Sequence, residues 1–229
     1  MQPPLYIPQR SSWDCGLACV CMALSALRAQ RPMNTAATDE LLTSERRTVW
    51  TVDLLLLLHR LAPPSTAITL TTTCAGAPPP SHFALPFYAH APGDAERVPA
   101  AFASAAAAHL DVREERAPLA PVLAELAART AVYVALVDLR LLTCTGCCEV
   151  HTARAAARAA VGGAPSPGST YAGHYVLLFG YSAASGRLAY YDPAPDASPL
   201  GCECDAAVCE RAWAEAGTDF DLIRVAAAA

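Results

Sequence analysis

The sequence has 229 residues, a formal net charge of -5 and 54% hydrophobic residues, which is enough material for one domain with a sizeable core. All 16 basic residues are arginines, and they form no stripe of the kind that neutralises nucleic-acid phosphates. Apolar runs such as Ala131 to Val137 are far shorter than the ~20 residues that span a bilayer, and the N-terminal residues lack a signal-peptide pattern. We therefore expect a single cytoplasmic domain over residues 1–229, with no nucleic-acid or membrane partner.

Ten cysteines would indicate a disulfide framework in a small secreted chain, but without an export signal we interpret them as thiols. Two groups have spacings compatible with halves of a zinc site: Cys144, Cys147 and Cys148, with His151 nearby, and Cys202 and Cys204. This pairing is not a standard zinc ribbon. We interpret these residues as free thiols or a redox pair, and we predict no metal site.

The first predicted element is an amphipathic helix that begins near Cys15. Leu17, Val20 and Leu24 recur at helical spacing, and Ser12 and Asp14 are candidate caps. This places the cysteine at a helix N-terminus.

A second helix is predicted from about Thr51 to Leu61, where Pro63 and Pro64 follow. The β-branched residues from Ile68 to Thr73 then predict a strand.

Between Val98 and Arg129 the Ala and Leu content, with breaks at Pro118 and Pro121, predicts two helices, the second from Val122 to Arg129. A buried strand is predicted from Val132 to Val137. The Ala, Gly, Pro and Ser content of Ala153 to Thr170 indicates a flexible surface insertion.

The last third of the chain predicts a β-hairpin, with strands from His174 to Tyr181 and from Arg187 to Asp192. Helices followed by strands give the fold class α+β, with N-terminal helices packed on an antiparallel sheet. A turn centred near Ala184 pairs Val176 with Asp192, which makes His174 a diagonal neighbour of the aspartate.

These residues together indicate a catalytic thiol site. The start of a helix favours a thiolate at Cys15, His174 would serve as its base, and Asp192 would orient the imidazole. Gln9 lies six residues before Cys15, and its side-chain amide is a candidate oxyanion donor beside the Cys15 amide. Taken singly, each residue has an ordinary structural interpretation: a buried thiol, a core histidine and a turn opener.

Three segments of this site resemble the bacteriocin-processing, C39-like peptidases, which are papain-like: Gln9 to Gly16, Gly173 to Tyr175, and Tyr191 to Pro193. A longer series of segments, in order along almost the whole chain, is similar to the guanylyl cyclase domain-containing family of plants and animals: Trp13 to Cys19, Val49 to Leu54, Gly173 to Val176, and Gly217 to Asp219. The resemblance implies a papain-like cysteine peptidase fold.

The family name implies conversion of GTP to cyclic GMP, with Mg2+ or Mn2+ as the metal. The sequence has no phosphate-binding Gly-x4-Gly-Lys-Ser/Thr loop and no lysine. Five charged residues could in principle bind a nucleotide: Arg46, Arg47, Asp53, Asp219 and Asp221. Their simpler interpretation is as solvated surface charges or, for Asp53, as a helix cap.

Three functional hypotheses follow. The first is a thiol hydrolase or acyl transferase that acts on an amide, ester or isopeptide of a small molecule or peptide and requires no cofactor. The second is the guanylyl cyclase. The third is a papain-like module that binds a partner without catalysis.

Overall fold

The computed structural model describes residues 1–27, 48–79, 82, 93–145 and 171–227. Within them a seven-stranded sheet has the order β2-β1-β7-β3-β4-β5-β6. The strands are β1 (Thr66–Thr72), β2 (Asp111–Glu114), β3 (Ala131–Asp138), β4 (Gly173–Ser182), β5 (Arg187–Tyr191), β6 (Cys202–Asp205) and β7 (Leu222–Ala227). The helices are α1 (Cys15–Ala26), α3 (Thr51–Leu61), α5 (Asp94–Ala107), α6 (Leu119–Ala128) and α8 (Ala206–Trp213).

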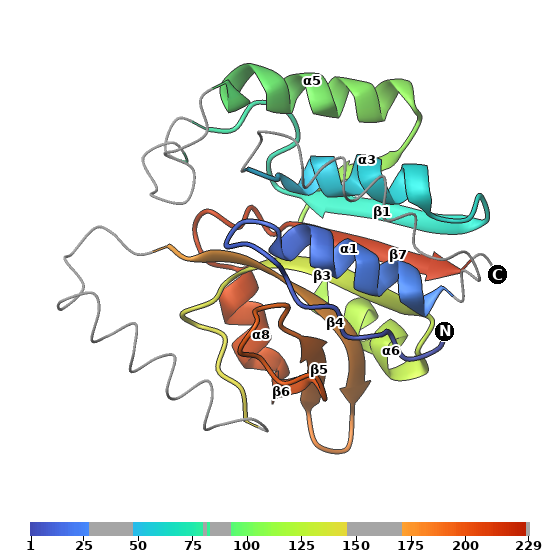
Figure 1. Cartoon of the computed structure of the whole chain (residues 1–229), viewed down its shortest axis with the longest axis vertical. Helices are drawn as coiled ribbons and strands as arrows, with labels where there is room; N and C mark the ends of the chain where they lie inside the picture. Colours follow the sequence, from blue (N-terminus) through green and yellow to red (C-terminus); the bar gives the residue numbers. More distant parts are fainter. Residues whose placement is uncertain (28–47, 80–81, 83–92, 146–170, 228–229) are drawn as a thin grey trace, which may run out of the picture.

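Helices cover both faces of the sheet (Figure 1). Strand β3 is buried along its whole length, and its side chains alternate between two cores. Val134 belongs to the core beneath α1 and α3, whereas Tyr133 belongs to the core beneath α6 and α8. Helix α5 packs on α3. The mixed α+β fold class is therefore confirmed.

Several predicted elements are confirmed at or near their bounds. Helix α1 begins at Cys15, α3 covers Thr51–Leu61 as predicted, and the β4–β5 hairpin is present. Leu177 pairs with Tyr191, which is the predicted register at the end of the hairpin that carries His174. A β-bulge between Leu178 and Gly180 shifts the pairing by one residue nearer the turn.

The sheet differs from the prediction in its membership and direction. It is mixed rather than wholly antiparallel, because β1 pairs with β2 in parallel. Strand β7, which was not predicted from the sequence, lies between β1 and β3 and pairs antiparallel with both. Strand β6 and helix α8 were likewise not predicted. A strand that pairs only with distant segments has no local turn signal to mark it, and alanines in β7 weaken its strand pattern.

Helix α6 begins at Leu119, three residues before the predicted start. Pro121 lies in its first turn, where the missing N–H has no helical acceptor to lose, so this proline does not break the helix. The predicted insertion from Ala153 to Thr170 lies outside the described residues.

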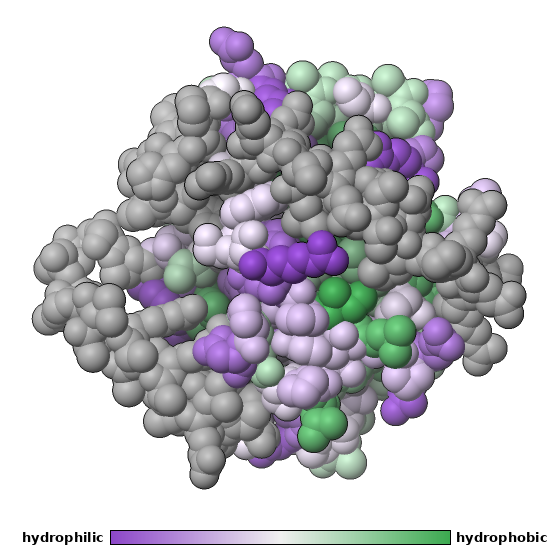
Figure 2. Space-filling view, viewed as in Figure 1, coloured by the Kyte–Doolittle hydropathy of each residue, from purple (hydrophilic) through white to green (hydrophobic). Residues whose placement is uncertain are grey.

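On the face viewed in Figure 2 the described surface is mostly hydrophilic, with apolar residues in small separate patches. The large hydrophobic side chains that are exposed in the described part are Leu5, Leu141 and Leu200. No helix within the described ranges is long and apolar enough to cross a bilayer.

Candidate functional site

Cys15 is the first residue of α1, and the loop before it is held by a buried carboxylate. Asp14 occupies the N-cap position, but its side chain accepts hydrogen bonds from the backbone N–H groups of Arg10 (3.1 Å) and Ser11 (2.9 Å). It does not cap the helix through its side chain. The N–H groups of the first turn of α1 are thus left uncapped by Asp14, beside the thiol.

His174 and Asp192 face each other at the same end of the sheet. His174 is the second residue of β4, and Asp192 directly follows β5. His174 Nε2 lies 2.8 Å from Asp192 Oδ1, which also accepts a hydrogen bond from the backbone N–H of Ala194 at 2.9 Å. The side chain of Asp192 is fully buried and that of His174 is 9% exposed, so water screens this pair little.

The third member of the group, Cys15, is close enough to His174 to form a hydrogen bond with it. Burial disfavours a charged imidazole, but a thiolate at Cys15 and the hydrogen bond to Asp192 outweigh burial and raise the pKa of His174 to about 10. Because Asp192 faces Nε2, Nδ1 is the ring nitrogen left for the sulfur. The arrangement favours a charged imidazolium at His174.

The N-terminal segment ties the cysteine loop to the aspartate. Gln9 donates its backbone N–H to the carbonyl of Pro193 at 2.7 Å, and the Tyr6 hydroxyl donates to the carbonyl of Ala194 at 3.1 Å. The Gln9 side chain does not donate toward the thiol: its Nε2 donates to the Ser11 carbonyl at 2.6 Å. One hydrogen of this amide is therefore engaged by Ser11, which leaves its second N–H for another acceptor.

The charged residues considered for a nucleotide have structural partners where they are described. Asp53 accepts a hydrogen bond from the backbone N–H of Trp50 at 2.9 Å in a capping box, and its carboxylate pairs with Arg97 at 2.6 Å. Asp219 pairs with His82 at 3.2 Å. Arg46 and Arg47 lie outside the described residues.

The cysteines of the proposed zinc halves are only partly described. Cys144, Cys202 and Cys204 are buried, and a hydrogen bond with Cys209 together with burial raises the pKa of Cys204. Within the described ranges, no group of three or more His, Cys, Asp or Glu side chains is placed to hold a metal ion. Cys147, Cys148 and His151 lie outside those ranges.

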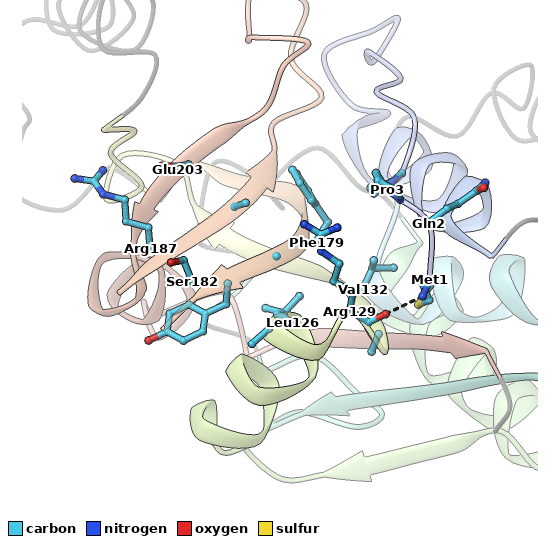
Figure 3. A pocket seen from close by; sticks show the side chains of 16 residues that line it. Met1, Gln2, Pro3, Leu126, Arg129, Val132, Phe179, Ser182, Arg187 and Glu203 are labelled. Atoms are coloured by element: carbon cyan, nitrogen blue, oxygen red, sulfur yellow. Dashed lines mark hydrogen bonds between the residues drawn. The ribbon is translucent and has the colours of Figure 1, made fainter. Parts of the chain in front are cut away.

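Two pockets lie away from the thiol. One, of about 280 Å³, lies between residues 1–4, the end of α6 and the β4–β5 hairpin, and Figure 3 shows Arg129 and Phe179 in its wall. The other, of about 530 Å³, lies between α6 and the strands that carry Arg113 and Arg224. Neither is lined by Cys15, His174 or Asp192.

The fold and this geometry define a mixed α+β domain that carries a buried cysteine, histidine and aspartate at one end of its sheet. The chain belongs to the family described as Guanylylate cyclase, whose pattern matches residues 5–225. It is 29% identical over 220 residues to Guanylyl cyclase 1 of Arabidopsis thaliana, an alignment that covers 96% of this chain and 74% of that protein. Both names are those of an enzyme. The predicted resemblance to guanylyl cyclase domain-containing proteins is confirmed, whereas the papain-like fold stays a prediction.

Proposed function

We propose that the protein is a papain-like thiol enzyme, a hydrolase or acyl transferase that acts on an amide, ester or isopeptide. The observation that carries the proposal is the 2.8 Å contact between His174 Nε2 and Asp192 Oδ1, both buried, next to a cysteine at the first position of a helix. Nucleophilic cysteines need a base within reach and a group that orients the base, and both are available to Cys15.

In this proposal the Cys15 thiolate attacks the carbonyl carbon of the substrate, and the C=O electron pair moves onto oxygen. The uncapped N–H groups at the start of α1 would stabilise that oxyanion, joined by the second N–H of the Gln9 side-chain amide. The intermediate collapses as His174 gives its proton to the leaving amine or alcohol, and a thioester remains on Cys15. Water, or another nucleophile deprotonated by His174, then releases the acyl group.

The test is reaction of the purified protein with p-nitrophenyl acetate, read by intact mass and peptide mapping. We expect an acetyl group on Cys15 in the wild type, none in Cys15→Ala, and acylation slowed about a hundredfold in His174→Ala because the base is lost. Cys74→Ala is the matched control, since burial raises the pKa of that partly exposed thiol to about 11. Acylation that is independent of both Cys15 and His174 would refute the proposal.

A second candidate, guanylyl cyclase, is supported by the family and by the name of the Arabidopsis relative. The described carboxylates fit a divalent metal poorly: Asp219 is paired with His82, Asp221 is hydrogen-bonded to Thr51, and no metal-binding group is present within the described ranges. Incubation with GTP and Mg2+ or Mn2+ tests this candidate. Cyclic GMP formed equally by wild type and Cys15→Ala would favour the cyclase, and a protein inactive in both assays would favour a binding module.

A further inference from the structure

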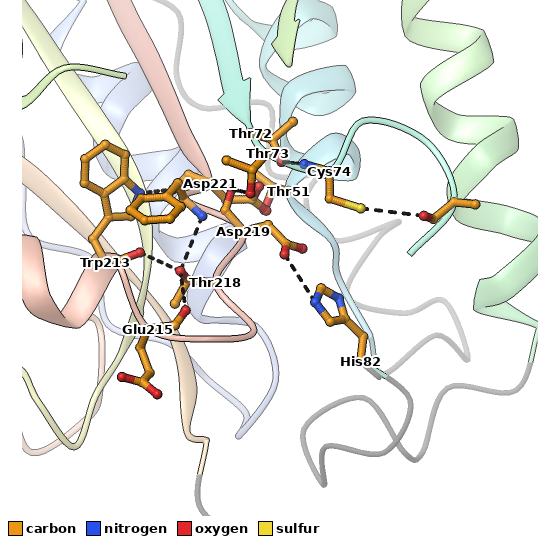
Figure 4. Close-up of polar contacts among 12 residues, drawn as sticks. Thr51, Thr72, Thr73, Cys74, His82, Trp213, Glu215, Thr218, Asp219 and Asp221 are labelled. Atoms are coloured by element: carbon orange, nitrogen blue, oxygen red, sulfur yellow. Dashed lines mark hydrogen bonds and ion pairs between the residues drawn. The ribbon is translucent and has the colours of Figure 1, made fainter. Parts of the chain in front are cut away.

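A second polar group contains the buried carboxylate of Asp221, which Figure 4 shows near Thr51 and Thr72. Asp221, in the loop before β7, accepts a hydrogen bond from the hydroxyl of Thr51, the first residue of α3. The same Thr51 oxygen lies 2.7 Å from the hydroxyl of Tyr175 in β4. All three side chains are buried. Three elements that are distant in sequence are thus joined by one chain of hydrogen bonds.

The direction of these bonds depends on the charge of Asp221. A threonine hydroxyl has one hydrogen, and Thr51 gives it to the carboxylate, so Tyr175 must donate to Thr51. If Asp221 is protonated, it can donate to Thr51, Thr51 can donate to Tyr175, and the Tyr175 O–H is released to donate elsewhere. One proton on Asp221 can therefore reverse the whole chain of hydrogen bonds.

Tyr175 also touches the thiol site. It follows His174 in β4, and its ring packs on the residue after Cys15: a Cβ atom on Gly16 would lie only 3.0 Å from Tyr175 Cδ2. The pKa of Tyr175 is raised by burial, by the charge of Asp221 and by the charge of Cys15. A freed Tyr175 O–H would have the Cys15 thiolate as the nearby anion that attracts it.

We propose that Thr51, Tyr175 and Asp221 form a positioning relay for the Cys15–His174 site, in which the proton on Asp221 decides whether Tyr175 donates to Thr51 or toward the thiol. The relay rests on the proposed function. None of the three residues has a covalent role. It also accounts for two segments of the family resemblance that the triad does not use, Val49 to Leu54 and Gly217 to Asp219, because they supply or flank Thr51 and Asp221.

The surroundings of Asp221 suit a group that titrates near neutrality. Burial is the main cause that raises the pKa of Asp221 to about 7, and the negative charge of Asp219 raises it further. Hydrogen bonds from Thr51 and Thr72 and the charge of His82 lower this pKa. Tyr175 and Cys74 are titratable neighbours of Asp221: burial raises the pKa of each, and the charge of Asp221 raises both further, after that of Asp219 in the case of Cys74.

The experiment measures the rate of Cys15 alkylation by iodoacetamide between about pH 6 and pH 8, with the modified residue located by peptide mapping. His174 does not titrate in this range, since its pKa is about 10. A hydrogen bond from Tyr175 makes the thiolate less nucleophilic, so the wild-type rate should fall about tenfold toward pH 6, which is the effect of one hydrogen bond to a charged group. Asp221→Asn, Tyr175→Phe and Thr51→Val should each abolish this pH-dependent step.

Thr51→Ser is the matched control, because it keeps the hydroxyl and should keep the step. If the fall in the Cys15 alkylation rate toward pH 6 persists in both Thr51→Val and Tyr175→Phe, the relay is wrong, even if Asp221→Asn does not fold. If His174→Ala slows alkylation while the relay variants match the wild type, only the relay is wrong. If His174→Ala leaves alkylation unchanged, the thiol site is refuted and the relay with it.

Discussion

Replacement of Asp221 by asparagine should change the way in which the stability of the protein depends on pH. Asp221 is 8% exposed, and burial raises the pKa of its carboxyl group from 3.8 to about 7 in the folded protein. In the unfolded chain the group is solvated and titrates near its ordinary value. The asparagine side chain has nearly the same shape and can still accept from Thr51, but it carries no titrating proton.

The sign follows from proton binding. Between about pH 4 and pH 7 the folded wild type holds a proton on Asp221 that the unfolded chain has released, so its free energy of unfolding falls as pH rises through this window. The two pKa values, 3.8 and about 7, differ by about 3 units, and each unit corresponds to about 1.4 kcal/mol, which gives a total loss of about 4 kcal/mol. Above about pH 7 both states are ionised and the difference stays constant.

Urea unfolding followed by tryptophan fluorescence measures this effect. The buried Trp213 donates its indole N–H to the Asp221 carbonyl at 3.1 Å, so its emission reports on the region directly. We expect the wild type to lose stability relative to Asp221→Asn from about pH 5 to pH 7. Asp111→Asn is the control, since Arg113 lowers the pKa of Asp111 and keeps its titration below this window. Parallel stability curves for wild type and Asp221→Asn would refute the reasoning.

Three further substitutions test the positions of side chains around the site. Asp192→Asn should lower the pKa of His174, because the imidazolium loses its charged partner, and an NMR titration of the ring measures this pKa. The same substitution should slow acylation of Cys15 by p-nitrophenyl acetate by about one to two orders of magnitude. Gly16→Ala should cost about 1–3 kcal/mol in urea unfolding, since the new Cβ would lie 2.8 Å from Leu54 Cδ1; an unchanged midpoint would contradict this packing. Asp53→Ala should cost about 1–2 kcal/mol through loss of its helix cap and ion pair, and should leave the alkylation profile of Cys15 unchanged.

The parts of the fold that the sequence predicted are those with a local signal. Helix α3 ends where two prolines follow, and the β4–β5 hairpin is closed by Gly186 at φ 68°, a conformation that favours glycine. Strand β7 was missed because its partners, β1 and β3, are distant in sequence and its own pattern is weakened by alanine. Strand β2 has four residues, three of them charged, and it pairs only along the parallel edge of the sheet.

The same division applies to the candidate site. His174 and Asp192 lie on one hairpin, so counting residues across the turn was enough to predict their contact, and the bulge lies nearer the turn than this pair. Thr51 and Asp221 are 170 residues apart, and nothing in their spacing indicates a contact. Thr51 lies in one segment that resembles the family, and Asp221 lies two residues after another, which is the signal that could have found them.

The N-terminal segment connects the cysteine loop to the hairpin that carries His174 and Asp192. Asp14 holds the loop at Arg10 and Ser11, and Gln9 is hydrogen-bonded through its backbone to Pro193, so hydrogen bonds connect the start of α1 to the residues after Asp192. His174, in turn, is fixed between them by the hydrogen bond to Asp192. In the proposed enzyme, a thiol and a base held by these hydrogen bonds would need little reorganisation to react, which is the property that catalysis by preorganised groups requires. A module that only binds a partner has no comparable need for a buried imidazole held between a thiol and a carboxylate.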